Sequence, residues 1–380
     1  MENFKYYNPT KIVFGKDTVP QIGDIISKYS YKKVLLLYGG GSIKKNGVYD
    51  CVVNSLNQHS IEFVEFGGVQ PNPVLSHARE AINAARANQV DSILAVGGGS
   101  VLDEAKAIAA GFYVNDVWNL FEKTEHASKA LPLFTVLTLS ATGSEMNSYG
   151  VLTNAEEKKK WSFGSRYTYP LVSIIDPTVQ MSLPWRQTVN GGVDSMSHIL
   201  EYYFTGPESE TTLSINEALL KTIIKSVNEL QVKEQDYKNR SELSWTASLA
   251  LSGLTGAGMN GGEWTVHGIE HAISALFPLV AHAEGLAVLF PAWMKYYSDN
   301  KPDRYIRFAT NLFNEDSVEG GIRAFQNLLK RWKAPITLGD LNISESNIPS
   351  LAENAIMTGN LGNHYQTDYN DVVRILKLAL

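Results

Sequence analysis

Short apolar runs alternate with amphipathic segments along the first half of the chain. Four of these runs have the length and residue types of strands, at residues 34–37, 62–66, 93–96 and 134–137. Segments with helical periodicity lie between them, including residues 74–89 and 101–111. Strands that alternate with helices predict crossover units and a largely parallel sheet that is covered on both faces.

The pattern changes after Pro184, where the strand signals disappear. Segments with helical periodicity follow, separated by Gly, Pro and Asn, at residues 190–204, 210–230, 240–255, 263–276, 284–298, 303–313, 317–332 and 348–358. We therefore predict an α/β domain over residues 1–185 and an all-helical domain over residues 186–380. A length of 380 residues is sufficient for two domains of roughly 150 residues each.

Composition and charge narrow the class of protein. With 44% hydrophobic and 19% charged residues, and a net charge of -6, the chain has the composition of a globular protein. Lys and Arg form no basic cluster, so we expect no nucleic-acid partner. The single cysteine, Cys51, cannot form an internal disulfide, and no apolar run reaches about 18 residues. We therefore expect a cytoplasmic protein that does not associate with membranes.

One glycine cluster in the first domain joins a predicted strand to a predicted helix. Residues 93–96 are followed by Gly97, Gly98, Gly99 and Ser100, after which the helical pattern begins. This order directs backbone N–H groups and the helix dipole at a phosphate group, and glycine lets the phosphate approach the backbone closely. The cluster is neither GxGxxG nor a Walker loop, and a tight strand-to-helix turn would produce the same pattern.

Two further loops follow predicted strands in the same way. Gly39, Gly40, Gly41 and Ser42 come after residues 34–37, and the hydroxyl-rich stretch 138–147 comes after residues 134–137. In a parallel sheet these loops lie at the carboxyl ends of the strands, where doubly wound folds bind ligands. Together the three loops favour a dinucleotide and predict a Rossmann-like fold for the N-terminal domain.

Histidines are concentrated in the second domain at spacings that suit a metal. His267, His271 and His282 lie within sixteen residues, and Asp194 precedes His198 by four. Residues four apart project from one face of a helix. One carboxylate with two or three imidazoles suits Fe(II), Zn(II) or Mn(II) and leaves a position open for substrate. A lone Asp-x-x-x-His pair is also typical of a capped or hydrogen-bonded helix, and the spacing alone would allow His267 to pair with His271.

These motifs resemble the iron-dependent (group III) alcohol dehydrogenases, and within them the branch of butanol dehydrogenases and NADPH-dependent aldehyde reductases. The stretch 97–106 is similar to the cofactor loop of the family, and the stretch 141–147 is similar to its second signature. Asp194-x-x-x-His198 and His267-x-x-x-His271, followed by a later histidine, match its metal segment. The four motifs occur in order and cover nearly the whole chain.

The resemblance implies which residues bind the metal. The implied ligands are Asp194, His198, His267 and His282. His271 then lies in the substrate pocket, where it either relays a proton or donates a hydrogen bond to the substrate. One feature departs from the family, in which the last ligand is one residue closer and is followed by glycine. Here Ala283 follows His282, and we assign the extra residue to the turn at 277–280.

The resemblance also implies the residues that contact the cofactor. They come from the three loops and one lysine: Gly39, Gly40, Gly41, Ser42, Gly97, Gly98, Gly99, Ser100, Asp103, Thr138, Leu139, Thr142, Asn147 and Lys160. Lys160 matches a position at the nicotinamide ribose, although one lysine among three in a charged turn would look the same. Candidates to line the substrate pocket are Tyr149, Trp161, Phe163 and Trp264.

We expect from this resemblance a metal-dependent, NAD(P)-linked dehydrogenase or reductase of small aliphatic alcohols and aldehydes, acting as a homodimer. Fe(II) is the metal expected, with Zn(II) or Mn(II) as alternatives. A divalent ion acts as a Lewis acid on the substrate oxygen, and the nicotinamide carries the hydride. Residues 39–45 contain two lysines and no carboxylate. A carboxylate there would repel a 2′-phosphate, so we expect NADP(H) to be preferred over NAD(H).

Three other functions are considered beside this one. Residues 267–271 also fit H-x-x-E-H, the signature of inverted zinc metalloproteases, with Glu270 as general base, but this leaves the glycine loops unexplained. A polyol dehydrogenase or a dehydroquinate synthase-like enzyme of the same architecture would need more Lys and Arg around the metal. A nucleotide sensor without catalytic activity would have no use for a complete metal site.

Overall fold

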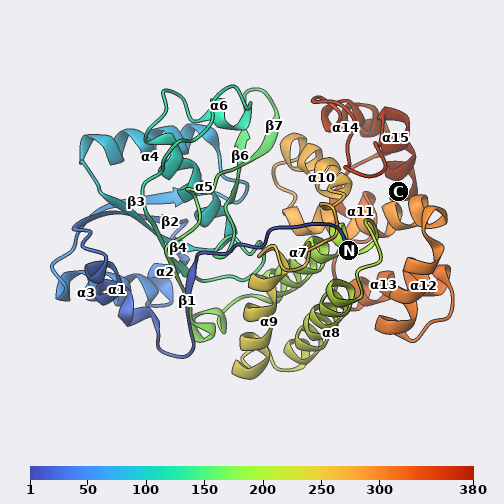
Figure 1. The fold of residues 1–380 in the computed structure, drawn as a ribbon, viewed down its shortest axis with the longest axis horizontal. Helices are drawn as coiled ribbons and strands as arrows, with labels where there is room; N and C mark the ends of the chain where they lie inside the picture. Colours follow the sequence, from blue (N-terminus) through green and yellow to red (C-terminus); the bar gives the residue numbers. More distant parts are fainter. The chain divides into compact units, whose positions relative to one another are not determined.

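The computed structural model describes all 380 residues, which form two compact units (Figure 1). The α/β unit comprises Tyr7–Leu183 and Gln235–Ser248. The helical unit comprises Met1–Tyr6, Pro184–Glu234 and Leu249–Leu380. No helix in either unit has both the length and the apolar character needed to cross a membrane.

A six-stranded parallel sheet forms the centre of the α/β unit, with strand order β1-β8-β5-β4-β2-β3. Its strands are β1 (Lys11–Phe14), β2 (Lys33–Gly39), β3 (Glu62–Val69), β4 (Ser92–Gly97), β5 (Leu133–Leu137) and β8 (Val172–Ile175). The four predicted strands are confirmed as β2, β3, β4 and β5. The two short strands β1 and β8 were not predicted from the pattern.

Helices cover both faces of this sheet. They are α1 (Ile22–Lys28), α2 (Ser42–Lys45), α3 (Val48–Gln58), α4 (Leu75–Ala87), α5 (Gly99–Gly111) and α6 (Trp118–Phe121). Val34 and Leu36 of β2 pack in one core with α1 and α3, whereas Leu35 and Leu37 pack in a second core with α4 and α5. Successive strand residues point to opposite faces, so a strand with two covered faces is apolar throughout.

A two-stranded antiparallel hairpin completes the unit, with strands β6 (Tyr149–Asn154) and β7 (Lys159–Gly164). The charged stretch between the strands forms the turn. The pattern of the sequence did not predict this hairpin, because its strands are separated by Glu and Lys rather than by glycine or proline.

The second half of the chain is helical, as predicted. Its helices are α7 (Trp185–Tyr203), α8 (Glu210–Val232), α9 (Tyr237–Ala250), α10 (Thr265–Leu276), α11 (His282–Tyr297), α12 (Pro302–Phe313), α13 (Val318–Arg331), α14 (Ile348–Ala355) and α15 (Tyr369–Leu378). Short 3-10 helices are η1 (Val19–Gln21), η2 (Pro177–Gln180), η3 (Ser298–Asn300), η4 (Gly339–Leu341) and η5 (Glu345–Asn347). Of the α-helices in the second half, only α15 lies outside the predicted segments; in the first half, α1, α2, α3 and α6 were not predicted either.

Helices α7, α10 and α11 carry the predicted metal ligands. Helix α11 packs against both α7 and α10. Gly285 of α11 lies against Glu270 of α10, and a Cβ at this glycine would come within 2.8 Å of the Glu270 Cγ. The glycine therefore permits the close approach that brings the start of α11 to α10.

Candidate functional site

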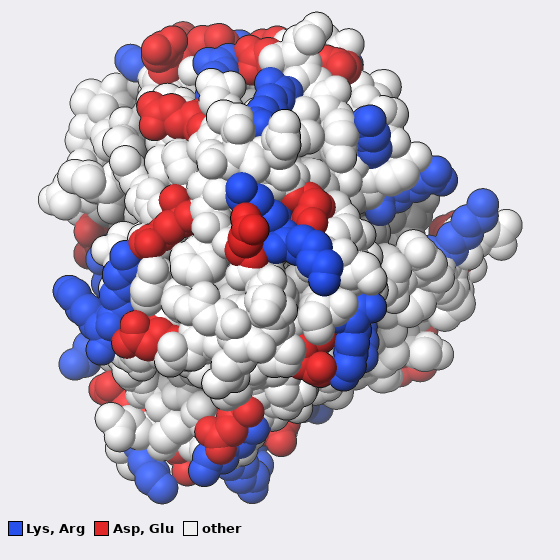
Figure 2. Space-filling model, turned by 90° about the vertical axis from the view of Figure 1, so that its left-hand side faces the viewer, with Lys and Arg blue, Asp and Glu red and all other residues white.

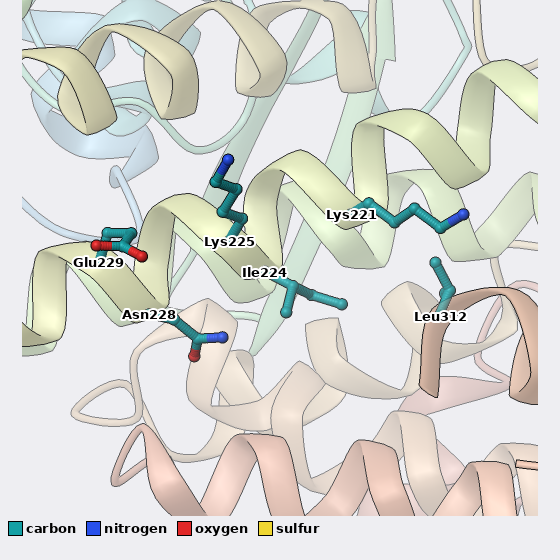
Figure 3. A pocket seen from close by; sticks show the side chains of 6 residues that line it. All are labelled: Lys221, Ile224, Lys225, Asn228, Glu229 and Leu312. Atoms are coloured by element: carbon teal, nitrogen blue, oxygen red, sulfur yellow. The ribbon is translucent and has the colours of Figure 1, made fainter. Parts of the chain in front are cut away.

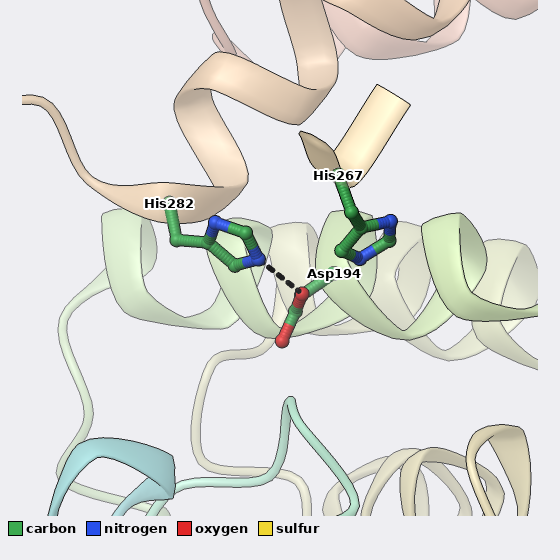
Figure 4. Close-up of side chains that lie close together, drawn as sticks. All are labelled: Asp194, His267 and His282. Atoms are coloured by element: carbon green, nitrogen blue, oxygen red, sulfur yellow. Dashed lines mark ion pairs between the residues drawn. The ribbon is translucent and has the colours of Figure 1, made fainter. Parts of the chain in front are cut away.

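Three of the predicted metal ligands come together from three different helices. One ligand atom from each of Asp194, His267 and His282 lies within 4.8 Å of those of the other two. The carboxylate of Asp194 on α7 lies between the two imidazoles (Figure 4), with its Oδ1 3.8 Å from the His282 Nε2. Asp194 and His267 are buried, and His282 is half-buried. We call these three residues the Asp/His cluster.

His198, the fourth predicted ligand, lies beside the Asp/His cluster but outside this 4.8 Å group. Its Nε2 is 3.8 Å from the Asp194 Oδ1, and its ring stacks on that of His267 with centroids 5.0 Å apart. Burial lowers the pKa of His198 well below the usual value, and the neighbouring His267 and His282 lower it further. The imidazole is therefore neutral, which is the form that binds a metal.

Two buried carboxylates hold the other nitrogen of two of these histidines. The His267 Nδ1 lies 2.7 Å from Glu201 Oε1, and the His282 Nδ1 forms a short hydrogen bond with Glu270 Oε2. Glu201 and Glu270 are almost completely buried. A carboxylate on Nδ1 fixes the tautomer of the ring and directs the lone pair of Nε2 outward, as in carboxylate–histidine–metal sites. Sequence analysis missed this role for both residues.

The signal that could have revealed Glu201 is its position on α7, seven residues after Asp194 and three after His198. These intervals place the three side chains along one face of the helix.

Glu270, which the metalloprotease alternative would use as a general base, forms hydrogen bonds with His282 and Ser274 instead. Its complete burial does not suit a base that must reach water and substrate.

The residues present fit a divalent metal ion. The His267 Nε2 is buried and has no hydrogen-bond partner, while its Nδ1 is occupied by Glu201. A buried nitrogen without a partner is costly unless it binds something. Carboxylate oxygen and imidazole nitrogen are donors that suit Fe(II), Zn(II) and Mn(II).

His271 is close to His282 but does not belong to the Asp/His cluster. Its ring centroid is 5.7 Å from that of His282, and its ligand atom falls within 4.8 Å of Glu270 and His282 rather than in the Asp/His cluster. The helix spacing that would have paired His267 with His271 as ligands therefore does not bring them into one group.

The glycine loops lie at the carboxyl ends of neighbouring strands. Strand β4 ends at Gly97 and α5 begins at Gly99, while β2, its neighbour in the sheet, ends at Gly39. The chain continues from β2 to β3 on one side and returns to β4 on the other, so these two loops flank the point where the strand order reverses. Doubly wound folds bind their ligands at this point.

The loop after β5 packs directly on the loop after β4. Thr138 donates its backbone N–H to the Gly97 carbonyl over 2.9 Å. A Cβ on Gly99 would lie 2.4 Å from Thr142 Cγ2, so only glycine fits there. Leu139 lies against Gly98 in the same way. The residues of these two loops that we predict to contact the cofactor therefore lie next to one another at the carboxyl ends of β4 and β5.

The buried side chain of Lys106 connects α5 with the loop after β5 and with β6 through hydrogen bonds. Lys106 donates from Nζ to Ser144 Oγ at 2.7 Å, to Asn147 Oδ1 at 2.9 Å and to the Tyr149 carbonyl at 2.7 Å. Ser144 in turn donates to Asp103 Oδ1 at 2.6 Å. Burial lowers the pKa of Lys106 to about 8, against the opposing effect of Asp103 and Glu145. Asp103 and Asn147 are therefore part of an internal network.

Lys160 is buried on β7 and does not lie in the charged turn. Its Nζ donates to Asn72 Oδ1 over 3.0 Å.

Two of the aromatic candidates for the substrate pocket pack inside the α/β unit. Trp161 stacks on Trp118 with ring centroids 5.5 Å apart, and Phe163 is buried in the core of this unit. Trp264 lies beside the Asp/His cluster, with its ring centroid 5.2 Å from that of His267.

The loop after β2 is open on one side. A Cβ on Gly40 or on Gly41 would meet no atom within 4 Å, but Gly41 has a φ of +96° and favours glycine. Lys44 on α2 does not extend freely from this loop, because its Nζ lies 2.6 Å from Glu65 Oε1 on β3. Lys45 is exposed.

A surface groove and the charge distribution on one face of the molecule lie outside the predicted sites. A groove of about 280 Å³ lies along α8 and α12 (Figure 3), lined by Lys221, Ile224, Lys225, Asn228, Glu229 and Leu312. It contains none of the predicted site residues. On the face drawn in Figure 2, Lys and Arg are interspersed with Asp and Glu, and neither sign forms a continuous area.

Two family descriptions match the chain one after the other. "Iron-containing alcohol dehydrogenase" matches residues 9–177, and "Fe-containing alcohol dehydrogenase family, C-terminal" matches residues 188–380.

Similar proteins extend this match over the whole chain. The chain is 41% identical to the probable NADH-dependent butanol dehydrogenase 2 of Bacillus subtilis, with all of both chains covered. It is 34% identical to the NADPH-dependent aldehyde reductase of Escherichia coli over 92% of each chain. The crystal structure of NADH-dependent butanol dehydrogenase A from Thermotoga maritima superposes with a TM-score of 0.98 at 48% identity, covering 100% of this chain and 99% of the other.

Proposed function

Because the chain belongs to the iron-containing alcohol dehydrogenase family, it is an NAD(P)-dependent alcohol dehydrogenase, and we propose that it interconverts small uncharged aliphatic alcohols and aldehydes. The family confirms the predicted resemblance, and its members use NAD(P) and a metal that is usually iron. The names of the relatives, butanol dehydrogenase and aldehyde reductase, support this substrate class. Residues 193–198 and 264–283 contain no Lys or Arg, so these segments offer no cation to a phosphorylated substrate.

The metal ligands that we propose are Asp194, His198, His267 and His282. The observation that carries this assignment is the Asp/His cluster, in which His267 keeps an unpartnered buried Nε2 while Glu201 occupies its Nδ1. Lewis-acid activation of the alcohol or carbonyl oxygen is the chemistry that a divalent metal supplies when bound. We propose Fe(II), with Zn(II) or Mn(II) as substitutes that the same donors accept.

The protein residues have separate tasks in this proposal. Glu201 and Glu270 accept hydrogen bonds from the Nδ1 of His267 and His282, and so hold both rings in orientation. His271, outside the Asp/His cluster but close to His282, either donates a hydrogen bond to the substrate oxygen or carries its proton. Gly97, Gly98 and Gly99 present backbone N–H groups to the pyrophosphate at the start of α5.

The preferred dinucleotide that we propose is NADP(H). Residues 39–45 contain no carboxylate, a side chain at Gly40 would meet no atom within 4 Å, and Ser42 and Lys45 are exposed on α2. Lys44 contributes less than the sequence suggests, because it is paired with Glu65. The relatives at 41% and 34% identity are named NADH-dependent and NADPH-dependent respectively, so the preference is proposed from the loop and not from the names. The expected ratio of kcat/KM for NADPH to that for NADH is above one.

The oligomeric state that we propose is the homodimer expected from the resemblance. Light scattering coupled to size-exclusion chromatography would test it, with twice the 42.0 kDa of one chain as the expected mass. A mass equal to that of a single chain at micromolar concentration would contradict it.

The activity is tested by the near-ultraviolet absorbance of NAD(P)H in protein loaded with Fe(II) or Zn(II). Reduction by NAD(P)H is compared between butanal and an aldose phosphate, and oxidation by NAD(P)+ between 1-butanol and glycerol, so that glycerol and the aldose phosphate probe the polyol and phosphorylated substrate classes. Butanal and 1-butanol are expected to react faster in their respective directions. Faster oxidation of glycerol, or faster reduction of the aldose phosphate, would contradict the proposed substrate class.

A further inference from the structure

A glutamate from a neighbouring strand controls the position of a lysine beside the open loop. Lys44 lies on α2, directly after the glycine loop at the end of β2, and Glu65 lies in the middle of β3. The Lys44 Nζ is 2.6 Å from Glu65 Oε1. Both side chains are partly exposed, at 46% for Lys44 and 36% for Glu65, so solvent can reach the pair.

Two tyrosines strengthen the hold of Glu65 on the lysine. Tyr38 and Tyr49 both donate their phenol groups to the Glu65 carboxylate, the latter over 2.8 Å. The Lys44 ammonium lies 4.9 Å from the centre of the Tyr38 ring and 4.6 Å from that of Tyr49. These contacts favour the charged forms, and the pKa of Glu65 is lowered to about 2, chiefly by Lys44 and then by Tyr38.

Glu65 is attached to β3 before the end of the sheet, whereas Lys44 follows the loop at that end. Glu65 pairs with Leu36 in β2, three residues before Gly39, where the loop begins. Three strand residues correspond to roughly 10 Å. The adenosine ribose of a dinucleotide binds at the carboxyl end of the strand next to the phosphate-binding loop, which here is β2.

We propose that Glu65 determines the dinucleotide specificity of this enzyme by holding Lys44 away from the 2′-phosphate of NADP(H). Removal of the carboxylate frees the ammonium to reach the open loop at Gly40, Gly41 and Ser42. Glu65 therefore weakens the preference for NADP(H) without touching NAD(H). The inference rests on the proposed dehydrogenase function, because it concerns the same cofactor site.

The first test measures ligand binding alone, with no need for metal or turnover. Adenosine 2′,5′-bisphosphate and AMP differ only in the 2′-phosphate, and calorimetry gives their dissociation constants for the full-length protein. Glu65→Gln is expected to tighten binding of the bisphosphate relative to AMP by about tenfold, the effect of one charge-assisted hydrogen bond. An unchanged or lower ratio would overturn the proposal.

Glu62→Gln is the matched control. Glu62 lies at the start of the same strand, is exposed, and carries the same charge, but it pairs with Lys33 at 3.6 Å and not with Lys44. This variant is expected to leave the ratio unchanged. If both variants raise the ratio equally, net charge rather than the position of Lys44 is responsible, and the proposal is wrong.

Lys44→Met separates the two residues. In the parent the substitution is expected to change the ratio less than twofold, because Glu65 holds the lysine. In the Glu65→Gln background it is expected to remove the tenfold gain. A gain that persists in Glu65→Gln/Lys44→Met would show that Glu65 repels the phosphate directly, which contradicts the role of Lys44.

Steady-state kinetics then connect the binding result with the enzyme. In Glu65→Gln, kcat/KM for NADPH is expected to rise while that for NADH stays constant. A fall confined to NADH would mean that Glu65 binds the ribose itself, and would overturn the proposal. Absence of turnover with either dinucleotide in the metal-loaded parent would instead contradict the proposed function, and the binding ratios would still decide the role of Glu65.

Discussion

The Asp/His cluster and the loop after β2 represent two ways of building a site in the same chain. In the cluster, the proposed ligand atoms belong to side chains on helices, and the buried carboxylates of Glu201 and Glu270 bond two of the histidines. In the loop, the proposed binding groups belong to the backbone, and the nearby ion pair between Lys44 and Glu65 is partly exposed. Burial separates the two cases, because charges that are removed from water interact strongly and exposed pairs contribute about 0 to 1 kcal/mol.

This difference predicts the size of the effect at each site. Loss of one partner in the helical unit leaves a buried group unsatisfied, which should cost much of the activity or of the metal affinity. Loss of one group in the loop only shifts the relative affinity for two similar dinucleotides. We therefore expect larger effects from substitutions of buried groups than from substitutions in the loop, and a reversed order of effects would contradict this difference between the two sites.

The largest effect is expected from Asp194→Ala. Removal of the carboxylate should weaken metal binding and lower kcat for alcohol oxidation by about a thousandfold, since Lewis-acid activation is worth several kcal/mol. Alcohol oxidation rates and circular dichroism of the purified variant check this. His364→Ala, a histidine of the helical unit outside the Asp/His cluster, is the control and should keep its activity.

A large loss of folding stability, rather than of catalytic rate, is expected from Lys106→Met. This lysine bonds Ser144, Asn147 and the Tyr149 carbonyl, and its charge faces Asp103 and Glu145. Its removal leaves buried acidic groups without a counter-charge, which should lower the free energy of unfolding by about 3–5 kcal/mol. Denaturant unfolding measures this. The exposed Lys158→Met serves as control, and equal destabilisation by both variants would contradict the structural role of Lys106.

Intermediate effects are expected from Glu201→Gln and Glu270→Gln. Each substitution keeps the shape of the side chain but weakens its hold on the Nδ1 of a histidine. Metal affinity should fall by about 10- to 100-fold, as is typical when such partners are changed. Competition with a fluorescent chelator measures it. Glu210→Gln is the control, because Glu210 is exposed on α8, pairs with Arg307 and should leave the affinity unchanged.

The smallest effect is expected from Gly40→Asp in the loop after β2. A side chain at Gly40 meets no atom within 4 Å, whereas one at Gly39 would lie 3.4 Å from the Val69 carbonyl. An aspartate at position 40 should repel the 2′-phosphate and lower the NADPH to NADH ratio of kcat/KM by about tenfold. Gly39→Asp should move it less. A ratio below one in the parent enzyme would show that the missing carboxylate does not set the preference.

The sequence predicts what depends on local spacing. The alternation of apolar runs and helical segments located four strands of the parallel sheet and the helices of the second half, because each pattern reflects which faces of one element are buried. Glycines after strands located the loops at the reversal of strand order. The strands β1 and β8 have only four residues each, and β6 and β7 flank a charged turn, so the pattern did not distinguish these four strands from loops.

Contacts between elements are what the sequence could not supply. Spacing grouped Asp194 with His198 and His267 with His271, whereas the structure groups Asp194, His267 and His282 from three helices. The pairing of Lys44 with Glu65 joins residues 21 positions apart on separate elements. Such pairs depend on how helices and strands pack against one another. The residue types and the periodicity of a single element do not reveal this packing.

The metal content of two histidine variants tests the central assignment most directly. His282→Ala and His271→Ala remove neighbouring imidazoles, of which only the first belongs to the Asp/His cluster. After loading with Fe(II) or Zn(II) and removal of unbound metal, the predicted result is that His271→Ala retains its ion and loses activity only in part. His282→Ala is predicted to lose both. A metal-free His271→Ala beside a His282→Ala that keeps its ion would contradict the assignment.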